Sequence, residues 1–229
     1  MNSNNQTFAF TPAQRQKALY WLVFWHTLVI AASNILVQIP FQIGELHTTW
    51  GAFSFPFIFL TTDLTVRIFG AKMARKIIFC VMIPALVLSY LISVLFHEGQ
   101  FVGFAALQTL DTFVARIAVA SFIAYLVGQL LDISVFNRLR QKGKWWVAPA
   151  ASTIIGNIID TALFFSIAFY QSSDEYMAAH WQQLALTDYA WKIAVSVLFF
   201  LPAYGLLLKA LTRRLTTLPA YNLGNHQPG

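Results

Sequence analysis

The chain has 229 residues, of which 58% are hydrophobic and only 10% are charged. Because soluble domains carry about 25% charged residues, this composition excludes an ordinary soluble domain and indicates an integral membrane protein. The formal net charge is +6, but the lysines and arginines fall in short clusters between apolar segments rather than along one face. We therefore predict no direct binding to nucleic acid.

Six apolar segments are each long enough to cross a bilayer, whose core needs about 20 apolar residues per helix. In chain order they cover 18–39, 51–70, 76–96, 113–134, 147–170 and 188–210. The sequence predicts an all-α membrane protein, a six-transmembrane-helix bundle that forms one domain over 18–214. A polar N-terminal tail, 1–17, precedes it, and the C-terminal tail, 215–229, is predicted to be disordered. The first segment lacks a cleavage pattern and is predicted to remain a membrane helix.

Lysine and arginine mark alternate connections of this bundle. They precede the first segment and follow the second, fourth and sixth, whereas 40–49, 97–111 and 171–187 contain neither residue. Short cytoplasmic loops hold the excess of basic residues in membrane proteins. This alternation predicts that both termini are cytoplasmic.

The strongest nucleotide and metal motifs do not occur in the sequence. It has no Walker-type glycine-rich motif, no His-Glu-x-x-His and no Cys-x-x-Cys. We therefore predict neither ATP binding by that route nor a metal site, and no cofactor. The single cysteine, Cys80, excludes an internal disulfide and is interpreted as a small packed hydrophobic residue.

Polar residues that lie three or four positions apart in the apolar segments share a helix face and are candidate functional residues. Asn34 and Gln38 share a face of the first segment, where interhelical hydrogen bonding and ligand contact explain them equally well. Asn157 and Asp160 share a face near the middle of the fifth segment. Asp160 is the deepest predicted carboxylate.

Two basic residues enter the membrane from the outer side. They are Arg116 on the fourth segment and Lys192 on the sixth, and either is a candidate structural partner for Asp160. Asp188 and Lys192 are also spaced to pair within one helix turn, which would leave Arg116 to find another acidic partner or a ligand. The predicted substrate-binding residues, on four helices, are Asn34, Gln38, Arg116, Asn157, Asp160 and Lys192.

Two further polar pairs lie toward the cytoplasmic side. Asp63 and Arg67, four residues apart in the inner half of the second segment, are predicted to form a gating or structural ion pair. Gln129 and Asp132 lie near the inner end of the fourth segment, next to a basic loop, and are predicted to be solvated boundary residues.

Several runs of the sequence resemble the queuosine precursor transporter group of the vitamin uptake transporter (VUT) family. The runs that carry this resemblance are His47–Leu60, Thr62–Gly70, Val135–Arg140, Trp145–Trp146, Ala151–Thr153, Gly156–Asn157 and Asp160–Thr161. The resemblance implies a multi-pass importer in the cell inner membrane, not an enzyme. It implies as substrate 7-cyano-7-deazaguanine, 7-aminomethyl-7-deazaguanine or both, for queuosine salvage into tRNA.

If the substrate is a deazaguanine, its N1–H and exocyclic amine form a paired donor edge that Asp160 would accept, while Asn157 and Asn34 would contact the remaining edge. A site with both Arg116 and Lys192 would favour the neutral cyano compound.

The family is also similar in architecture to the S components of energy-coupling-factor transporters, so a separate energising module stays an open alternative. Two other functions stay open as well. They are uptake of another flat molecule, such as a vitamin, and an intramembrane enzyme that uses Asp63 and Asp160 as an acid–base pair.

Overall fold

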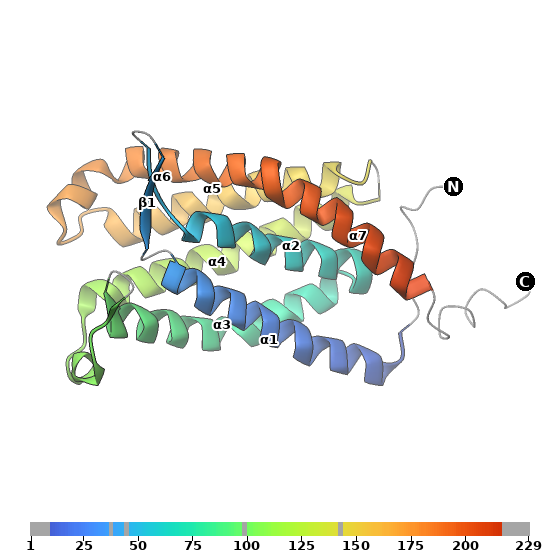
Figure 1. Ribbon diagram of the computed structural model, residues 1–229, viewed down its shortest axis with the longest axis horizontal. Coiled ribbons are helices and arrows are strands. Elements are labelled where there is room, and N and C mark those ends of the chain that lie inside the picture. The colour runs from blue at the N-terminus through green and yellow to red at the C-terminus, as the bar shows by residue number, and fades with distance from the viewer. Residues whose placement is uncertain (1–9, 37–38, 44–45, 98–99, 142–143, 217–229) are drawn as a thin grey trace, which may run out of the picture.

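The computed structural model describes residues 10–36, 39–43, 46–97, 100–141 and 144–216. They form an elongated helical bundle whose helices run roughly along its long axis (Figure 1). The helices are α1 Pro12–Leu36, α2 Gly51–Phe69, α3 Ala71–Leu95, α4 Thr112–Leu139, α5 Val147–Phe169, α6 Glu175–Val195 and α7 Leu201–Thr216. Successive helices reverse direction, except that α6 continues into α7.

Four helical stretches are long and apolar enough to cross a membrane. They are α3, α4, α5 and the continuous stretch Glu175–Arg214. A π-helical turn, η3 Ser196–Phe200, joins α6 to α7 within that last stretch, and the N–H of Leu201 bonds the carbonyl of Ser196. Such a turn holds one extra residue and often marks a functional position in a helix. Apolar helices of this length fit a multi-pass membrane protein.

Two short antiparallel hairpins connect helices at one end of the bundle. Strands β1 Pro40–Ile43 and β2 Leu46–Thr49 pair between α1 and α2, with Pro40 opposite Thr49. Strands β3 Phe96–His97 and β4 Gln100–Phe101 pair after α3, before the 3₁₀ helix η2 Phe104–Gln108. These hairpins lie at the end opposite to the start of α1 and the end of α7 (Figure 1).

The segment 171–187, predicted to be a connection, is mostly helical. Helix α6 begins at Glu175, and the Asp174 side chain caps it by accepting a hydrogen bond from the Met177 N–H at 3.0 Å. The prediction was wrong here because hydropathy locates the apolar part of a helix, whereas a capped polar extension continues beyond it. At the other end, α7 extends to Thr216, and 217–229 lie outside the described residues.

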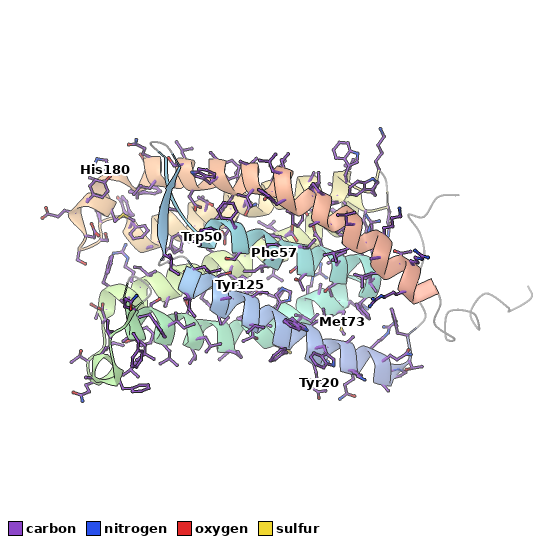
Figure 2. All side chains as sticks on the ribbon, in the orientation of Figure 1. Tyr20, Trp50, Phe57, Met73, Tyr125 and His180 are labelled. Carbon is purple, nitrogen blue, oxygen red and sulfur yellow. The ribbon has the colours of Figure 1, made fainter. Side chains whose placement is uncertain are left out.

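Apolar side chains cover both the inside and the outside of the bundle. The interior contains Phe59, Val66 and Tyr204, each at most 3% exposed. On the outside, Tyr20 is 65% exposed and lies at the edge of the bundle (Figure 2). Cys80 is exposed as well, so its interpretation as a packed residue was wrong. Because a membrane helix is apolar on its lipid-facing side too, composition alone could not separate the two faces.

Helices α4 and α5 pack closely because glycines lie where they meet. A Cβ atom on Gly128 of α4 would lie 3.2 Å from the Asp160 Cβ of α5. A Cβ atom on Gly156 of α5 would lie 3.4 Å from the Asp132 Cβ of α4. Small residues allow membrane helices to approach this closely. The packing places the two aspartates at the interface between α4 and α5.

Candidate functional site

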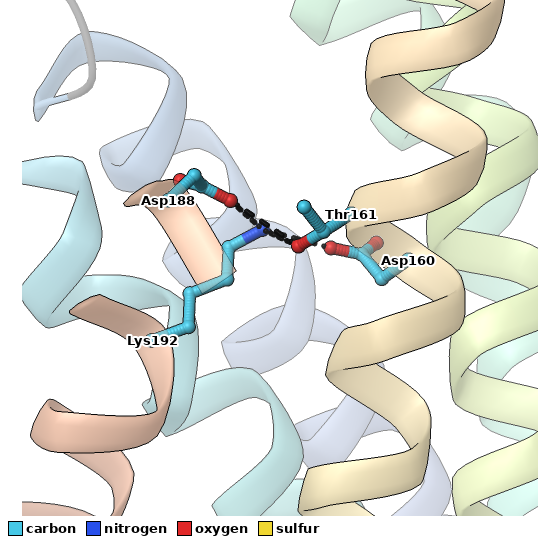
Figure 3. A network of polar contacts seen from close by, with 4 residues as sticks. All are labelled: Asp160, Thr161, Asp188 and Lys192. Atoms are coloured by element: carbon cyan, nitrogen blue, oxygen red, sulfur yellow. Dashed lines mark hydrogen bonds and ion pairs between the residues drawn. The ribbon is translucent and has the colours of Figure 1, made fainter. Parts of the chain in front are cut away.

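The first of two buried polar clusters lies between α5 and α6 and centres on a lysine. The Lys192 ammonium lies 2.8 Å from Asp188 Oδ2 and 3.1 Å from both Asp160 Oδ2 and Thr161 Oγ1. Thr161 in turn donates its hydroxyl proton to Asp188 at 3.2 Å. Figure 3 shows the ammonium between the two carboxylates. We call these four residues the lysine cluster.

The lysine cluster carries two carboxylates for one ammonium group. Lys192 and Asp160 are each 5% exposed, so this charge lies in the interior, where unpaired ions are strongly disfavoured. The Lys192 ammonium contacts only one oxygen of Asp160, Oδ2. Among the described residues no donor reaches the other oxygen, Oδ1, so it can accept hydrogen bonds from a ligand.

Asn157 extends this polar surface by one helix turn. It is 2% exposed, and it shares a face of α5 with Asp160 and Thr161. Within the described part of the chain its amide makes no hydrogen bond to a side chain or to the backbone of another element. Asn157 and Asp160 therefore offer a donor and two acceptors side by side.

The structure brings together three of the six predicted binding residues, namely Asn157, Asp160 and Lys192. Of the two candidate partners of Asp160, Arg116 and Lys192, the structure pairs it with Lys192, and the spacing of Asp188 and Lys192 within one helix turn also gives an ion pair, as predicted. Gln38 and the side chain of Asn34 lie outside the described residues, so their predicted roles stay predictions.

Arg116 lies away from this cluster. Its guanidinium donates to the carbonyls of Ile167 at 2.7 Å, Gln171 at 3.4 Å and Tyr170, at the end of α5. The last carbonyls of a helix have no partner within it, and a cation there also meets the negative end of the helix dipole. The expectation that Arg116 needs an acidic partner or a ligand was wrong, because it considered only side chains.

The second buried polar cluster lies between α2, α4 and α5, and it contains Asp63, Asp132 and Ser152, each 0% exposed. The Ser152 hydroxyl lies 3.4 and 3.5 Å from the two oxygens of Asp63. Asp132 approaches from α4: its Cβ would lie 3.4 Å from a Cβ on Gly156, one helix turn after Ser152, and its carboxyl group is close enough to Asp63 for the two to interact electrostatically. In the described structure, however, no donor completes a hydrogen bond to either Asp132 oxygen. We call these three residues the aspartate cluster.

A chain of polar side chains continues from this cluster toward α1. Gln129, one turn before Asp132, is 1% exposed, and its Oε1 accepts a hydrogen bond from the Thr62 hydroxyl at 2.6 Å. His26 Nε2 lies 3.2 Å from the same hydroxyl. The prediction that Gln129 and Asp132 are solvated boundary residues was therefore wrong. Both are covered by neighbouring helices, which the flanking basic loop could not reveal.

Asp63 and Arg67 do not form the predicted ion pair. Arg67 Nε donates to the Tyr204 hydroxyl at 3.1 Å, Nη2 donates to the Trp145 carbonyl at 3.4 Å, and the guanidinium lies 5.4 Å from the centroid of the Phe136 ring. Both salt bridges between described residues belong to Lys192. Arg67 thus links the end of α2 to α7 and to the residue just before α5, whereas Asp63 lies beside Ser152 of α5.

A sequence signal for Asp132 does exist. The pattern glycine, amide, two apolar residues, aspartate occurs in α4 as Gly128–Asp132 and in α5 as Gly156–Asp160. The two helices run in opposite directions, and each glycine packs against the aspartate Cβ of the other helix. The repeated pattern marks both aspartates as interface residues.

The structure limits the other chemistries considered. Within the described residues, no group of three or more histidines, cysteines, aspartates or glutamates could hold a metal ion. Asp63 and Asp160 lie in different clusters, so they do not form a single acid–base pair.

In a multi-pass helical bundle, ionisable side chains in the interior mark functional sites such as the substrate or ion pathways of transporters. Over residues 49–207 the chain matches the family model described as "Putative vitamin uptake transporter", and it belongs to this family.

Three relatives are similar along most of their length. The chain is 61% identical, over 90% of its length and 93% of the relative, to the "Queuosine precursor transporter" of Escherichia coli K12. It is 55% identical, over 91% and 94%, to the "Probable queuosine precursor transporter" of Haemophilus influenzae, and 27% identical, over 80% and 82%, to the protein of that name from Bacillus subtilis. No solved structure matches the chain.

Proposed function

We propose that this protein transports queuosine precursors, 7-cyano-7-deazaguanine and 7-aminomethyl-7-deazaguanine, across the cell inner membrane for salvage into tRNA. The observation that carries this proposal is the 61% identity to a queuosine precursor transporter over nearly the full length of both chains. The protein handles the free precursor and does not bind tRNA. It acts as a transporter and leaves the substrate chemically unchanged.

The proposed topology has six membrane passes, with α6, η3 and α7 forming one pass. The start of α1 and the end of α7 lie at the same end of the bundle (Figure 1). Basic residues gather at that end, at the start of α3 and the ends of α4 and α7, and include Lys72, Arg75, Arg138, Arg140, Lys209, Arg213 and Arg214. By the positive-inside rule this end is cytoplasmic, and so are both termini.

The proposed substrate site is the lysine cluster together with Asn157. A deazaguanine offers the N1–H and the exocyclic amine side by side, and the carboxylate of Asp160 has the acceptors for this paired edge. Asn157 contacts the carbonyl beside that edge through its amide N–H. Asn34, on α1, remains a proposed contact for the rest of the ring.

The charge of the cluster bears on the choice of substrate. With Arg116 bonded to α5 carbonyls, Lys192 is the only cation of the four-residue cluster, and Asp160 and Asp188 outnumber it. A site of net negative charge does not repel a positively charged aminomethyl group. The earlier reason to favour the neutral cyano compound therefore no longer applies, and both precursors fit.

Uptake into liposomes that contain only the purified protein tests the proposal. We expect labelled 7-cyano-7-deazaguanine to enter, and unlabelled deazaguanines, but not a vitamin such as riboflavin, to compete. Competition by the vitamin alone would favour a vitamin transporter, and a chemically altered product would favour an enzyme. Absence of uptake in this system, with uptake restored by added cell membranes, would indicate a separate energising module.

A matched pair of variants tests the site. Asp160→Asn removes the acceptor pair, and we expect uptake to fall at least tenfold, because a buried polar site loses affinity strongly when a ligand donor is left unpaired. Asp111→Asn is the control: Asp111 is exposed, caps α4 by accepting from the Phe113 and Val114 N–H groups, and asparagine caps helices as well as aspartate does. Normal uptake by Asp160→Asn at normal membrane abundance would refute the assignment.

A further inference from the structure

The aspartate cluster is not needed to bind a deazaguanine at the lysine cluster, and its geometry indicates a separate role. We propose that Asp63 and Asp132 together hold one exchangeable proton, and that release and rebinding of this proton couple substrate transport to a proton gradient. This inference rests on the proposed function, since a coupling site is meaningful only in a transporter.

The first argument is the lack of a counterion. Asp63 and Asp132 come from α2 and α4, are both 0% exposed, and their carboxyl groups are close enough to interact electrostatically. No lysine or arginine among the described residues forms a salt bridge with either. Two ionised carboxylates in such a position would repel each other in a medium of low dielectric constant. Buried carboxyl pairs resolve this conflict by sharing a proton.

The second argument is the hydrogen bonding of Asp132. Both of its oxygens are buried, and in the described structure neither accepts a hydrogen bond from any donor. Buried polar atoms are nearly always hydrogen-bonded, so a buried aspartate whose two oxygens accept no hydrogen bond requires an explanation. A proton on either carboxyl group supplies the missing donor, because it makes an O–H that the other group accepts.

The charged groups around the pair are bonded elsewhere, so none of them replaces the shared proton. The titratable or charged side chains on the surrounding helices include His26 (α1), Arg67 (α2), Tyr125 (α4), Asp160 (α5) and Tyr204 (α7), and Arg140 follows α4. Arg67 is bonded to Tyr204, Arg140 donates to the Val66 and Arg67 carbonyls, and Asp160 is paired with Lys192. His26 contacts Thr62 rather than either aspartate.

A proton suits the geometry better than a metal cation does. Hard cations such as Ca²⁺ take six or more oxygen ligands. Here the Ser152 hydroxyl reaches only the Asp63 carboxyl group, and the described residues contain no group of three or more histidines, cysteines, aspartates or glutamates that could hold a metal ion. A proton requires only the two carboxyl groups in contact.

The contact between α4 and α5 connects the proton site to the substrate site. Asp132 lies against Gly156, and Asp160 lies against Gly128. A shift of α4 along α5 therefore changes the surroundings of both aspartates together. Shifts of packed helices by an ångström or two are a common way in which two sites of a protein are coupled. The same movement can expose Asp63 and Asp132 and release the substrate from the lysine cluster.

The test uses the full-length protein in liposomes with an outside pH one unit below the inside and the membrane potential held at zero. If one proton enters with each neutral 7-cyano-7-deazaguanine, the substrate concentration inside should reach about ten times that outside. The reason is that one pH unit is a tenfold ratio of proton concentrations. A protonophore should abolish this accumulation. We expect Asp132→Asn to lower the ratio of inside to outside substrate to about one, while exchange of labelled for unlabelled substrate continues. The control, Asp111→Asn, should accumulate about tenfold.

Several outcomes would overturn the inference. One is exchange by the wild-type protein without accumulation in the pH gradient, which leaves the proposed function intact. Tenfold accumulation by Asp132→Asn, or accumulation driven by a sodium gradient instead, would overturn it too. Absence of both exchange and uptake in the wild type would refute the proposed function and the inference together.

Infrared spectroscopy gives a second readout that does not depend on transport. The wild-type protein should show the C=O absorption of a protonated carboxyl group, and this band should be missing or shifted in Asp132→Asn and in Asp63→Asn. Ser152→Ala, which removes the hydroxyl beside Asp63, should shift the band without removing it. Identical spectra for the wild type and both aspartate variants would contradict the shared proton.

Discussion

The lysine cluster and the aspartate cluster both use α5 and both bury two carboxyl groups, but they differ in what accompanies these groups. In the lysine cluster an ammonium lies within 3.1 Å of both carboxylates. In the aspartate cluster the nearby polar group is a neutral hydroxyl. A buried carboxyl group can be accommodated with a counterion or with a proton, and the two choices predict different responses to mutation.

The largest expected effect is the loss of the counterion. Lys192→Met leaves Asp160 and Asp188 without their cation, and breaking a buried ion pair by removing one partner lowers the free energy of unfolding by about 3–5 kcal/mol. We expect a lower thermal unfolding midpoint in detergent and no uptake. The control is Lys209→Met, on the same continuous helix, because Lys209 is exposed.

A double variant shows whether charge balance is the cause. Lys192→Met combined with Asp160→Asn removes both charges, so most of the lost stability should return while uptake stays absent. If the double variant were as unstable as Lys192→Met alone, loss of packing rather than unpaired charge would be responsible.

The aspartate cluster should respond in the opposite way. Asp132→Asn removes no counterion, and the new amide can donate a hydrogen bond to Asp63 in place of the shared proton. We expect the free energy of unfolding to change by no more than about 1 kcal/mol. Thermal unfolding of this variant beside Lys192→Met measures the contrast directly. Equal destabilisation of the two variants would mean that Asp132 has an ionic partner.

The difference between these clusters also explains what the sequence could predict. The pairing of Asp188 with Lys192 follows from their spacing in one helix and is confirmed, whereas depth left both Arg116 and Lys192 as partners for Asp160, and the structure selects Lys192. Arg67 instead bonds Tyr204, 137 residues away, and Arg116 bonds backbone carbonyls. Helical spacing describes neighbours within a helix, whereas those partners depend on how helices pack together.

The sequence did not reveal that Asp132 is buried, because burial also depends on how the helices pack. Hydropathy and flanking charges place a residue along a helix, but whether it is covered depends on the neighbouring helices. Asp132 is close to a basic loop in the sequence, yet it is 0% exposed, and Gly156 of α5 packs against its Cβ. The repeated glycine–amide–aspartate pattern of α4 and α5 reflects that packing.

A smaller effect is expected where the two clusters meet. Gly156→Ala places a Cβ atom 3.0 Å from Cε1 of Phe59 on α2 and in ordinary contact, 3.4 Å, with Asp132 Cβ, so the Phe59 ring must shift by a few tenths of an ångström. Overpacking of this kind lowers the free energy of unfolding by about 1–3 kcal/mol. We also expect proton-driven accumulation to fall more than substrate exchange does. Val119→Ala, at an exposed position of α4, is the control.

The smallest expected effect is the interaction between Asp63 and Arg67, measured by a double-mutant cycle of unfolding free energies. Asp63→Asn and Arg67→Gln should be additive within about 0.5 kcal/mol, whereas Arg67→Gln and Tyr204→Phe, whose wild-type side chains lie 3.1 Å apart, should show a larger interaction energy. If Asp63 and Arg67 interacted more strongly than Arg67 and Tyr204, Asp63 would have a counterion. The aspartate cluster would then be balanced like the lysine cluster, and a shared proton would no longer be required.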